Sequence, residues 1–359
     1  MTDTYDIAVI EGDGIGPEIL GHVTPWLTEL AADYGVEFRC TSFPWGSDYH
    51  LETGAMMPEA GVEQLRAFDA ILLGAVGHPD VPDHVTLHGL LLPIRKQFDQ
   101  RICLRPSVLY DGVESPLRGY RGGDIDFVVY RENTEGEYAN VGGRVHTGFD
   151  HEVAIQTGVF TRSGTESIVR AAFEAATERE HHLTSVTKSN AQAYGMVFWD
   201  EVVSAVATDY PAVTVDRILV DAAAMDLIRR PEAFDVIVAS NLFGDILTDI
   251  GAIITGSMGL APSANLTDQP DVPSMFEPVH GSAPDIAGQG IANPLATILS
   301  AAMLCESLGE EALAAAIEQA VTAQLADQAA PRTPDLGGDA TTREVVADLD
   351  RRMRMSDSR

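Results

Sequence analysis

Short runs of apolar, largely β-branched residues alternate along this chain with longer stretches that fit helices. The runs predict buried strands, and they cover residues 7–10, 70–73, 127–130, 217–220 and 236–239. The stretches that fit helices cover residues 17–34, 164–180, 194–208 and 310–329. In the last of them a core-facing stripe recurs every four residues, formed by Leu313, Ile317, Val321 and Leu325. Strands that alternate with helices predict an α/β fold.

The length of 359 residues favours two subdomains, although no linker rich in serine, glycine or proline divides the chain. Residues 139–156 carry glycine between short alternating runs and predict a protruding hairpin. No apolar run approaches the roughly 20 residues that span a bilayer, and residues 1–6 do not resemble a secretion signal. The three cysteines are too scattered for a disulfide framework or a metal site, which indicates a reducing compartment. We therefore expect a soluble, cytoplasmic protein.

Acidic side chains outnumber basic ones by 54 to 23, which gives a formal net charge of −31. This charge excludes nucleic acid or an anionic membrane as the principal partner. Because 45% of the residues are hydrophobic, the chain can bury a large core and the acid load predicts an acidic surface, not disorder. Lys96 and Lys188 are the only lysines. We favour a salt-adapted protein over an ordinary acidic one, which would keep more surface lysines.

The first predicted strand runs into a glycine-rich turn, residues 12–18, with the sequence GDGIGPE. A dinucleotide-binding fingerprint would need a third glycine at position 17, where this chain has Pro17. The motif is therefore not a Rossmann fingerprint. A tight strand-to-helix turn and a ligand contact both stay open for these glycines.

Asp245 and Asp249 follow the predicted strand 236–239 and are four residues apart, so on a helix they share a face. Two such carboxylates repel unless a cation holds them, and hard oxygen ligands suit Mg²⁺ or Mn²⁺. The alternative is a solvated acidic face. The segment is too apolar for a surface helix, which favours the metal; its apolar residues are Leu242, Phe243, Ile246, Leu247 and Ile250.

Three arginines, Arg95, Arg105 and Arg131, each stand near the end of an apolar stretch and could clamp carboxylates if they converge. Lys188 is retained where lysine is otherwise almost absent, which indicates a need for a side chain that can lose its proton.

Residues 275–294 are rich in glycine and proline and predict an ordered loop. Its backbone could bind a phosphate and Asp285 could accept from a ribose, although a plain structural loop is the alternative.

Seven motifs in one order within residues 7–300 resemble the β-decarboxylating dehydrogenase family of isocitrate, 3-isopropylmalate and tartrate or D-malate dehydrogenases. They are GDGIGPE, LLPIRKQFDQRICLRP, YRENTEGEY, TKSNA, VDAAAM, SNLFGDILTDIGA and EPVHGSAPDIAGQGIANP, and TPDLGGDATT extends the match. The resemblance implies an isopropylmalate dehydrogenase-like two-domain α/β fold with a shared large sheet, not a true Rossmann fold. Residues 1–102 and 255–359 would form the cofactor-side domain, and residues 103–254 the second domain with a hairpin arm near 139–156.

The resemblance also implies roles for the candidate residues in an obligate homodimer with a shared active site. Arg95, Arg105 and Arg131 would hold the substrate carboxylates. Asp245 and Asp249, together with Asp221 of the partner subunit, would bind Mg²⁺ or Mn²⁺. Lys188 of the partner subunit would deprotonate the substrate 2-hydroxyl, and Tyr138 would protonate the enolate left after CO₂ departs. Whether K⁺ is also required and whether dimers pair into tetramers stay open.

The family's NAD-dependent members carry the acidic and aliphatic pair found here as Asp285 and Ile286, so the resemblance implies NAD⁺ as cofactor. The other residues implied on the cofactor side are His280, Gly281, Ser282, Ala283, Asn293 and Asn190.

Departures from the family pattern bear on the substrate. Isocitrate enzymes have serine where this chain has Gly89, and isopropylmalate enzymes have glutamate where it has His88. His88, Leu91 and Leu92 would face the group on substrate C3. The segments PWGSDYHLETG, HPDVPDHVTLHGLLLPIRKQFDQ and SMFEPVHG resemble the tartrate/D-malate branch, although that branch usually has tryptophan at position 88.

We therefore expect NAD-dependent oxidative decarboxylation of D-malate, to pyruvate and CO₂, and/or of tartrate. The alternative is a 3-isopropylmalate dehydrogenase of leucine biosynthesis. A more remote alternative is a non-catalytic acidic dimeric scaffold, which would have no use for the full set of arginines, aspartates, lysine and tyrosine.

The acidic surface predicts that stability rises with KCl into the molar range, where the Debye length shortens to about 3 Å and self-repulsion falls. Melting temperatures measured from low to molar KCl check this expectation. A melting temperature that stays flat or falls would count against salt adaptation.

Overall fold

The computed structural model describes residues 3–356. They form two compact units: unit 1 comprises the described residues of 1–100, 106–125 and 252–359, and unit 2 comprises residues 101–105 and 126–251. Ten strands are hydrogen-bonded in the order β2-β1-β3-β12-β11-β4-β5-β10-β8-β9, and a separate ribbon contains β6 and β7. Strand β4 (Ile102–Val108) contributes residues to both units. The predicted α/β fold is confirmed.

The sheet strands of unit 1 are β1 (Asp3–Gly12), β2 (Val36–Phe43), β3 (Ala70–Ala75), β11 (Pro262–Leu266) and β12 (Ser274–Pro278). β1 pairs in parallel with β2 and β3, β3 pairs in parallel with β12, and β11 is antiparallel to β12. Apolar side chains of β1 and β3 are fully buried, which explains why both runs were recognisable in the sequence.

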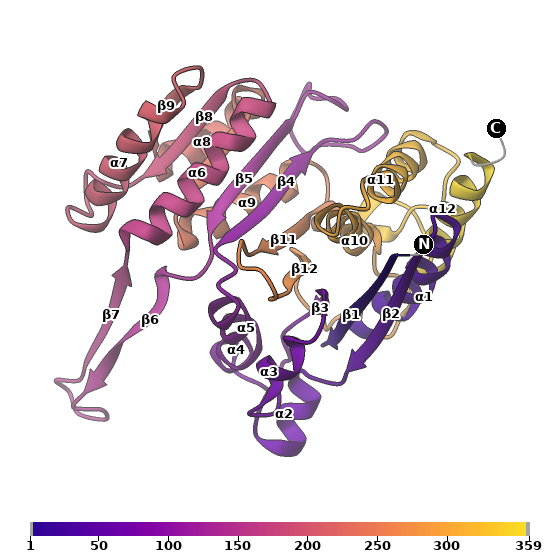
Figure 1. Ribbon diagram of the computed structural model, residues 1–359, viewed down its shortest axis with the longest axis horizontal. Helices are drawn as coiled ribbons and strands as arrows, with labels where there is room; N and C mark the ends of the chain where they lie inside the picture. Colours follow the sequence, from indigo (N-terminus) through magenta and orange to yellow (C-terminus); the bar gives the residue numbers. More distant parts are fainter. Residues whose placement is uncertain (1–2, 357–359) are drawn as a thin grey trace. The chain divides into compact units, whose positions relative to one another are not determined.

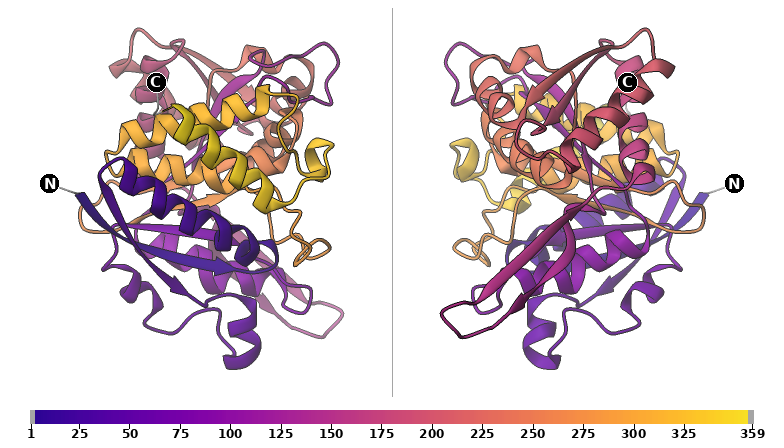
Figure 2. Two further views of the ribbon diagram at one scale, coloured as in Figure 1. Left: turned by 90° about the vertical axis from the view of Figure 1, so that its right-hand side faces the viewer. Right: turned by 90° about the vertical axis from the view of Figure 1, so that its left-hand side faces the viewer.

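The long helices of unit 1 are α1 (Ile15–Asp33), α10 (Leu295–Ser307), α11 (Glu311–Ala326) and α12 (Thr342–Ser356). α10 packs on β11 and β12. α12 packs on α1 and α11, and the left view of Figure 2 shows α12, in yellow, among the helices on that side. The predicted helices over 17–34 and 310–329 are thus confirmed. The shorter helical segments are α2 (Ser47–Thr53), α3 (Gly61–Leu65), α4 (Asp83–Thr86), η1 (Leu87–Leu91), α5 (Leu92–Gln97), η4 (Met258–Leu260) and η5 (Pro334–Leu336).

One sequence prediction in unit 1 was wrong. The segment 275–294 was predicted to be a loop throughout, but its start belongs to β12, all five residues of which are buried. β12 pairs with β3 on one side and β11 on the other. The strand was not predicted because the charged residue Glu277 is typical of an exposed segment. In the structure its carboxylate is buried against polar partners such as Arg95.

Unit 2 holds the parallel strands β5 (Asp126–Glu132), β8 (His182–Thr187), β9 (Thr214–Leu219) and β10 (Val236–Ala239). Its helices are α6 (Arg162–Glu178), α7 (Gly195–Val206), α8 (Val220–Arg229), α9 (Asn241–Ile254, ending in unit 1), η2 (Ala207–Asp209) and η3 (Pro231–Ala233). The predicted strand 217–220 is not a buried one: β9 is the edge strand, is mostly exposed or half-buried, and ends before Val220.

The predicted hairpin is confirmed. β6 (Gly136–Val145) and β7 (Val153–Val159) pair antiparallel and form the narrow ribbon seen in Figure 1. Its apolar side chains are exposed, with Val145 at 52% and Ile155 at 57%. Apolar side chains on an open two-stranded ribbon are poorly stabilised in water, so a ribbon of this kind gains stability when another surface covers it.

None of the three cysteines, Cys40, Cys103 and Cys305, forms a disulfide. Among the described residues, no helix combines the length and the apolar composition needed to cross a bilayer.

Candidate active site

Asp245 of α9 is the centre of a polar cluster in unit 2. Its Oδ1 lies 2.6 Å from Nη1 of Arg131 and 3.2 Å from Nη1 of Arg105. Arg105 also donates to Thr248 Oγ1 at 2.8 Å, one turn further along α9. Both arginines are nearly fully buried. The structure therefore brings two of the three predicted arginines to a predicted metal ligand.

This arrangement follows from the order of the strands. Arg131 stands near the carboxyl end of β5, and β10, which pairs with β5 in parallel, ends just before α9 begins. Carboxyl ends of parallel strands meet at one edge of a sheet, where α/β proteins bind ligands. Gly244 allows the close approach, since a Cβ there would lie 2.6 Å from Arg131 Cγ.

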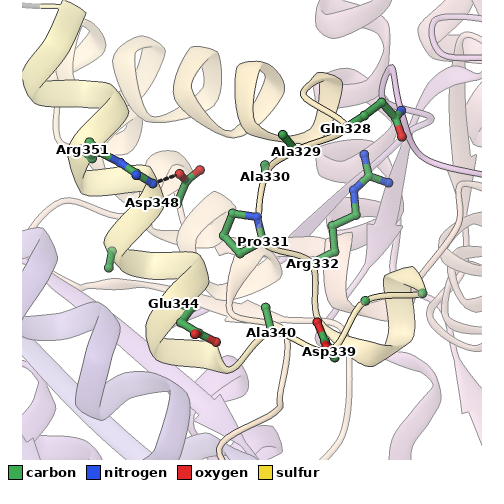
Figure 3. Close-up of a pocket in the computed structure, with 13 residues that line it drawn as sticks. Gln328, Ala329, Ala330, Pro331, Arg332, Asp339, Ala340, Glu344, Asp348 and Arg351 are labelled. Carbon is green, nitrogen blue, oxygen red and sulfur yellow. Dashed lines mark hydrogen bonds and ion pairs between the residues drawn. The ribbon is translucent and has the colours of Figure 1, made fainter.

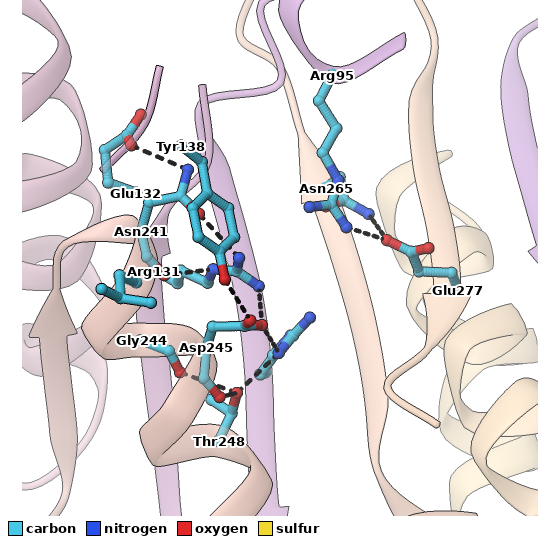
Figure 4. Close-up of polar contacts among 12 residues, drawn as sticks. Arg95, Arg131, Glu132, Tyr138, Asn241, Gly244, Asp245, Thr248, Asn265 and Glu277 are labelled. Atoms are coloured by element: carbon cyan, nitrogen blue, oxygen red, sulfur yellow. Dashed lines mark hydrogen bonds and ion pairs between the residues drawn. The ribbon is translucent and has the colours of Figure 1, made fainter. Parts of the chain in front are cut away.

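Tyr138, at the base of the β6–β7 ribbon, completes the contacts of Asp245. Its hydroxyl donates to Asp245 Oδ2 at 3.0 Å, and the Arg131 guanidinium lies 5.6 Å from the centre of its ring (Figure 4). Partial burial, together with the charge of Asp245, raises the pKa of Tyr138. The phenol is therefore kept protonated and able to donate.

Asp249 lies one helical turn after Asp245. Partial burial and the charge of Asp245 raise the pKa of Asp249, which shows that the two carboxylates interact unfavourably. Two oxygen donors at this spacing fit a hard divalent cation. Within residues 3–356 no three His, Cys, Asp or Glu side chains gather into a metal site, so this pair alone would not complete the coordination of a metal ion.

The other predicted metal ligand, Asp221, lies in the first turn of α8. Its Oδ1 is 2.5 Å from Nζ of Lys188, which follows β8, and this contact lowers the pKa of Asp221. The Asp221 side chain is 60% exposed and that of Lys188 is 26% exposed. The structure therefore pairs these two predicted residues with each other, on a surface of unit 2, and their described contacts do not include Asp245 or Asp249.

Sequence reasoning missed the support behind Arg131. Arg131 donates from Nε to the Asn241 carbonyl at 2.9 Å and from Nη2 to Asn241 Oδ1 at 2.8 Å. The Asn241 amide donates in turn to the Glu135 carbonyl at 3.2 Å and to Glu132 Oε2 at 3.4 Å. These contacts fix which side of the Asn241 amide faces Arg131. The signal in the sequence was a run of polar residues, RENTEGE, directly after a buried strand.

Glu132 itself is 1% exposed and accepts at Oε1 from the Thr134 backbone amide and hydroxyl, at 2.7 and 3.0 Å. Burial raises its pKa to about 7, although the hydrogen bonds from Thr134 and Glu135 act in the opposite direction. Glu137 accepts from Ser240 Oγ and from the Leu242 amide, and so caps the start of α9.

Arg95, the third predicted arginine, lies in unit 1 within α5 and is 5% exposed. Its Nη2 is 2.5 Å from Glu277 Oε1, which also accepts from the Asn265 amide at 2.8 Å (Figure 4). Its Nε is buried and has no hydrogen-bond partner among the described residues.

The residues predicted to face substrate C3 lie in a wide helical turn of unit 1, Leu87–Leu91, and just after it. His88 is exposed, whereas Leu91 and Leu92 are 8% and 7% exposed. Gly89 packs on Met56 so closely that a Cβ would lie 2.5 Å from Met56 Cγ.

The predicted cofactor residues of unit 1 lie in the segment that follows β12. His280 has a buried Nε2 without a partner among the described residues, and burial lowers its pKa. Asn293 is buried and donates to Asp335 Oδ2 at 2.9 Å, whereas Asp285 is exposed. An exposed carboxylate and an unpaired buried nitrogen fit the adenosine part of a dinucleotide. The remaining predicted residue, Asn190, is exposed in unit 2.

A wide hollow of about 970 Å³ on unit 1 holds none of the predicted site residues (Figure 3). It is lined by residues of 328–332, 337–340 and 344–351 and includes the ion pair of Asp348 with Arg351. The candidate chemistry therefore lies in the buried polar clusters and not in this hollow.

Residues 6–349 match the family model described as isocitrate/isopropylmalate dehydrogenase. The chain is 50% identical over 352 residues to a probable tartrate dehydrogenase/decarboxylase of Bacillus subtilis (strain 168), covering 98% of each protein. It is 49% identical over 358 residues to the D-malate dehydrogenase (decarboxylating) of Escherichia coli (strain K12), covering 96% of this chain and 98% of that protein. Its identity to the 3-isopropylmalate dehydrogenase of Thermobifida fusca (strain YX) is 47% over 351 residues, covering 98% of each.

Among solved structures, the isocitrate dehydrogenase of Methylococcus capsulatus superposes with a TM-score of 0.86 at 32% identity, covering 98% of this chain and 99% of that one. The expected isopropylmalate dehydrogenase-like fold is thereby confirmed.

The raised pKa of Glu132 predicts how stability depends on pH. The folded-state pKa of about 7 exceeds the ordinary value of 4.5, so between these limits the folded state binds more protons than the unfolded state. Stability therefore falls as pH rises through this window, by up to about 3 kcal/mol relative to Glu132→Gln. Urea unfolding of both proteins from pH 4.5 to 8 measures the difference, and parallel curves would contradict it.

Proposed function

Because the chain belongs to the isocitrate/isopropylmalate dehydrogenase family, we propose that it is an NAD-dependent, divalent-metal-dependent oxidative decarboxylase of a 2-hydroxy acid, D-malate and/or tartrate. The observation that carries this proposal is the cluster around Asp245. It joins two carboxylate-binding arginines, a protonated tyrosine and a pair of adjacent aspartates in one place.

In the proposed mechanism, some residues bind the substrate and others transfer protons. When bound, Mg²⁺ or Mn²⁺ supplies Lewis-acid charge at the substrate oxygens and NAD⁺ supplies the hydride acceptor. Arg105 and Arg131 hold a substrate carboxylate, and the backing by Asn241 fixes the angle of the Arg131 fork. Arg95 is the third proposed clamp.

Two side chains move protons. Lys188, proposed to come from the partner subunit, accepts the proton of the substrate 2-hydroxyl as C2 is oxidised. After the carboxylate on C3 leaves as CO₂, Tyr138 gives its hydroxyl proton to C3. The raised pKa of Tyr138 suits this role, since the phenol keeps its proton until loss of CO₂ leaves the enolate that accepts it.

Asp285 supports NAD⁺ as the cofactor and not NADP⁺. Its carboxylate is exposed in the segment after β12, where it can accept from a ribose diol and would repel a 2′-phosphate. His280 and Asn293, in the same segment, are proposed to contact the adenosine.

Substituting Asp245 or Asp249 should weaken metal binding, but the two substitutions should differ in their effect on the stability of the metal-free protein. Loss of a ligand by Asp249→Asn should weaken Mn²⁺ binding by at least about tenfold, since losing even a supporting outer partner costs that much. Asp249→Asn relieves the repulsion from Asp245, so the metal-free protein should be no less stable. Asp245→Asn should lower both metal affinity and stability, because the carboxylate charge that Arg105 and Arg131 both contact is removed.

Calorimetric Mn²⁺ titration and thermal unfolding measure these effects. Asp209→Asn, an exposed aspartate of the same unit, is the control. Unchanged metal affinity in both active-site variants would remove the metal assignment.

A homodimer is the proposed working form. Unit 2 exposes large apolar side chains on α7, α8 and α9 and just before α7, namely Tyr194, Val197, Met225, Ile228 and Ile246. Exposed apolar residues of this number, together with those of the β6–β7 ribbon, support an interface between copies of the chain. The exposed pair of Lys188 and Asp221 would then enter the partner's site.

Lys188→Arg should fold normally and lose hydride transfer by about 10²–10⁴-fold, because guanidinium cannot act as a base near neutral pH. NADH formation at 340 nm measures the loss. Retention of more than roughly a tenth of kcat would contradict the role of general base.

Mixing variants tests the sharing between subunits. If Lys188 and Asp249 of one active site come from different subunits, unfolding and refolding Lys188→Arg with Asp249→Asn should recover about a quarter of wild-type activity, since half of the dimers hold one intact site. No recovery, in a sample that forms dimers, would place both residues in one subunit.

The choice of substrate rests on the turn Leu87–Leu91. Gly89 has no room for a side chain because Met56 fills the space beside it, which argues against the serine of isocitrate enzymes. Leu91 and Leu92 are turned into the core, and His88 offers an exposed polar group. This wall suits hydrogen or hydroxyl on C3 better than a branched alkyl group. Leu87, 41% exposed in the same turn, favours the alternative substrate, 3-isopropylmalate.

A substrate panel decides between these readings. With NAD⁺ and Mg²⁺ or Mn²⁺, kcat/KM for D-malate or tartrate should exceed that for 3-isopropylmalate, and isocitrate should be poor. Some cross-reactivity is expected, because one apolar methylene is worth only about 1–3 kcal/mol. A kcat/KM for 3-isopropylmalate about tenfold above that for D-malate and for tartrate would overturn the assignment, and no NAD⁺ reduction with any of them would favour the scaffold.

A further inference from the structure

Residues 283–293 of unit 1, called here the cofactor loop, are held by a carboxylate from a distant part of the sequence. Glu18, in the first turn of α1, accepts at Oε2 from the backbone amide of Gly288 at 2.9 Å. Its Oε1 faces the backbone amide of Ala292 at 3.4 Å. The two oxygens of one side chain thus bind two amides of the same loop.

Thr342, the first residue of α12, holds the same stretch. Its amide donates to the Gly290 carbonyl at 2.9 Å, and its hydroxyl donates to the Ala292 carbonyl at 2.6 Å. The hydroxyl oxygen also lies 3.3 Å from Glu18 Oε1. The loop is therefore bonded by first-turn residues of two helices, α1 and α12, that pack on each other.

The glycine turn before α1 secures the beginning of the loop. The amide of Ile15 donates to the Ser282 carbonyl at 2.9 Å, and a Cβ on Gly14 would lie only 2.0 Å from that oxygen. The GDGIGPE motif therefore does more than turn the chain from β1 into α1. Its glycine lets the loop approach, and its glutamate binds the far end of the loop.

Two glycines make the loop costly to order, although it also has internal hydrogen bonds such as that from the Gln289 side chain to the Asp285 carbonyl at 2.8 Å. Gly288 and Gly290 have φ of 74° and 69°, and neither would meet a neighbouring atom if it carried a Cβ. Two glycines in an open surface segment lose much conformational entropy on ordering. Glu18 and Thr342 offset this cost, and the loop carries Asp285, the residue proposed to select the cofactor.

We propose that Glu18 is a positioning residue for the cofactor: by holding the backbone of residues 288–292 it fixes the loop that presents Asp285 to the adenosine ribose. This inference rests on the proposed use of NAD⁺. Glu18 itself is not proposed to touch the reacting atoms, so its loss should change cofactor affinity and leave the chemical step nearly intact.

The test compares Glu18→Ala and Glu18→Gln with Glu29→Ala, a substitution of an exposed glutamate on the same helix. Hydrogen exchange of the cofactor-free protein measures the loop directly, and NADH fluorescence titration measures cofactor affinity. Loss of the charge-assisted bonds to two amides should speed hydrogen exchange in residues 283–293. It should also weaken NADH binding by about tenfold and raise KM for NAD⁺ by about the same factor. At saturating NAD⁺, kcat and KM for the acid substrate should stay within about threefold of wild type.

Glu18→Gln keeps one acceptor oxygen and should lie between wild type and Glu18→Ala; it also carries the test if Glu18→Ala does not fold. Unchanged exchange in the loop, unchanged NADH affinity, or an equal effect of Glu29→Ala would overturn the proposal, as would a loss of kcat without a change in KM for NAD⁺. If the wild type binds NADPH and not NADH, the proposed cofactor is wrong, and the same comparison made with NADPH then decides the role of Glu18.

Discussion

The site depends on a single negative charge that three different elements approach. Asp245 projects from α9 and meets Arg105 from β4, Arg131 from β5 and Tyr138 from the base of the β6–β7 ribbon. Two nearly buried guanidinium groups contact this carboxylate, and its negative charge offsets part of their mutual repulsion. The carboxylate therefore has to stand where the first turns of α9 place it. The small size of Gly244 and the cap supplied by Glu137 both serve that placement.

In the proposed dimer, the same charge would belong to a site that one chain does not complete by itself. Asp245 and Asp249 repel each other, and among residues 3–356 no third acidic, histidine or cysteine side chain joins them in a group that could hold a metal ion. Lys188 and Asp221 form an ion pair near the surface of unit 2, and the described contacts of their side chains are with each other. Apolar side chains exposed on α7, α8 and the ribbon surround this pair in sequence. In the proposed dimer, a second copy of the chain would cover those apolar side chains. The same association would bring Lys188 and Asp221 of one subunit to Asp245 and Asp249 of the other.

Patterns of local chemistry predicted much of this structure, and long-range polar contacts account for what they missed. The strand at 236–239, the hairpin and the helix carrying Asp245 were recognisable because apolar periodicity and glycine placement act over a few residues. The exposed edge strand β9 reads like a buried one, since its sequence does not record which strands flank it. β12 was missed because Glu277 is polar yet buried against Arg95. For the site, residue types indicated the arginines and aspartates, whereas the roles of Asn241 and Glu132 depend on a contact between positions 109 residues apart.

The acidic residues of this chain serve two physically different purposes. Exposed carboxylates interact through water, and salt screens them within a few ångströms. A second group accepts hydrogen bonds from backbone amides at buried or half-buried positions: Asp13 binds the amides of Ser47 and Gly77 at 2.6 and 2.8 Å, and Glu132 binds the amide of Thr134. Short, enclosed bonds of this kind are hardly affected by dissolved ions. A chain can therefore carry many surface carboxylates without disturbing its active site. The condition is that the carboxylates of the site form hydrogen bonds with buried donors, where dissolved ions do not screen them.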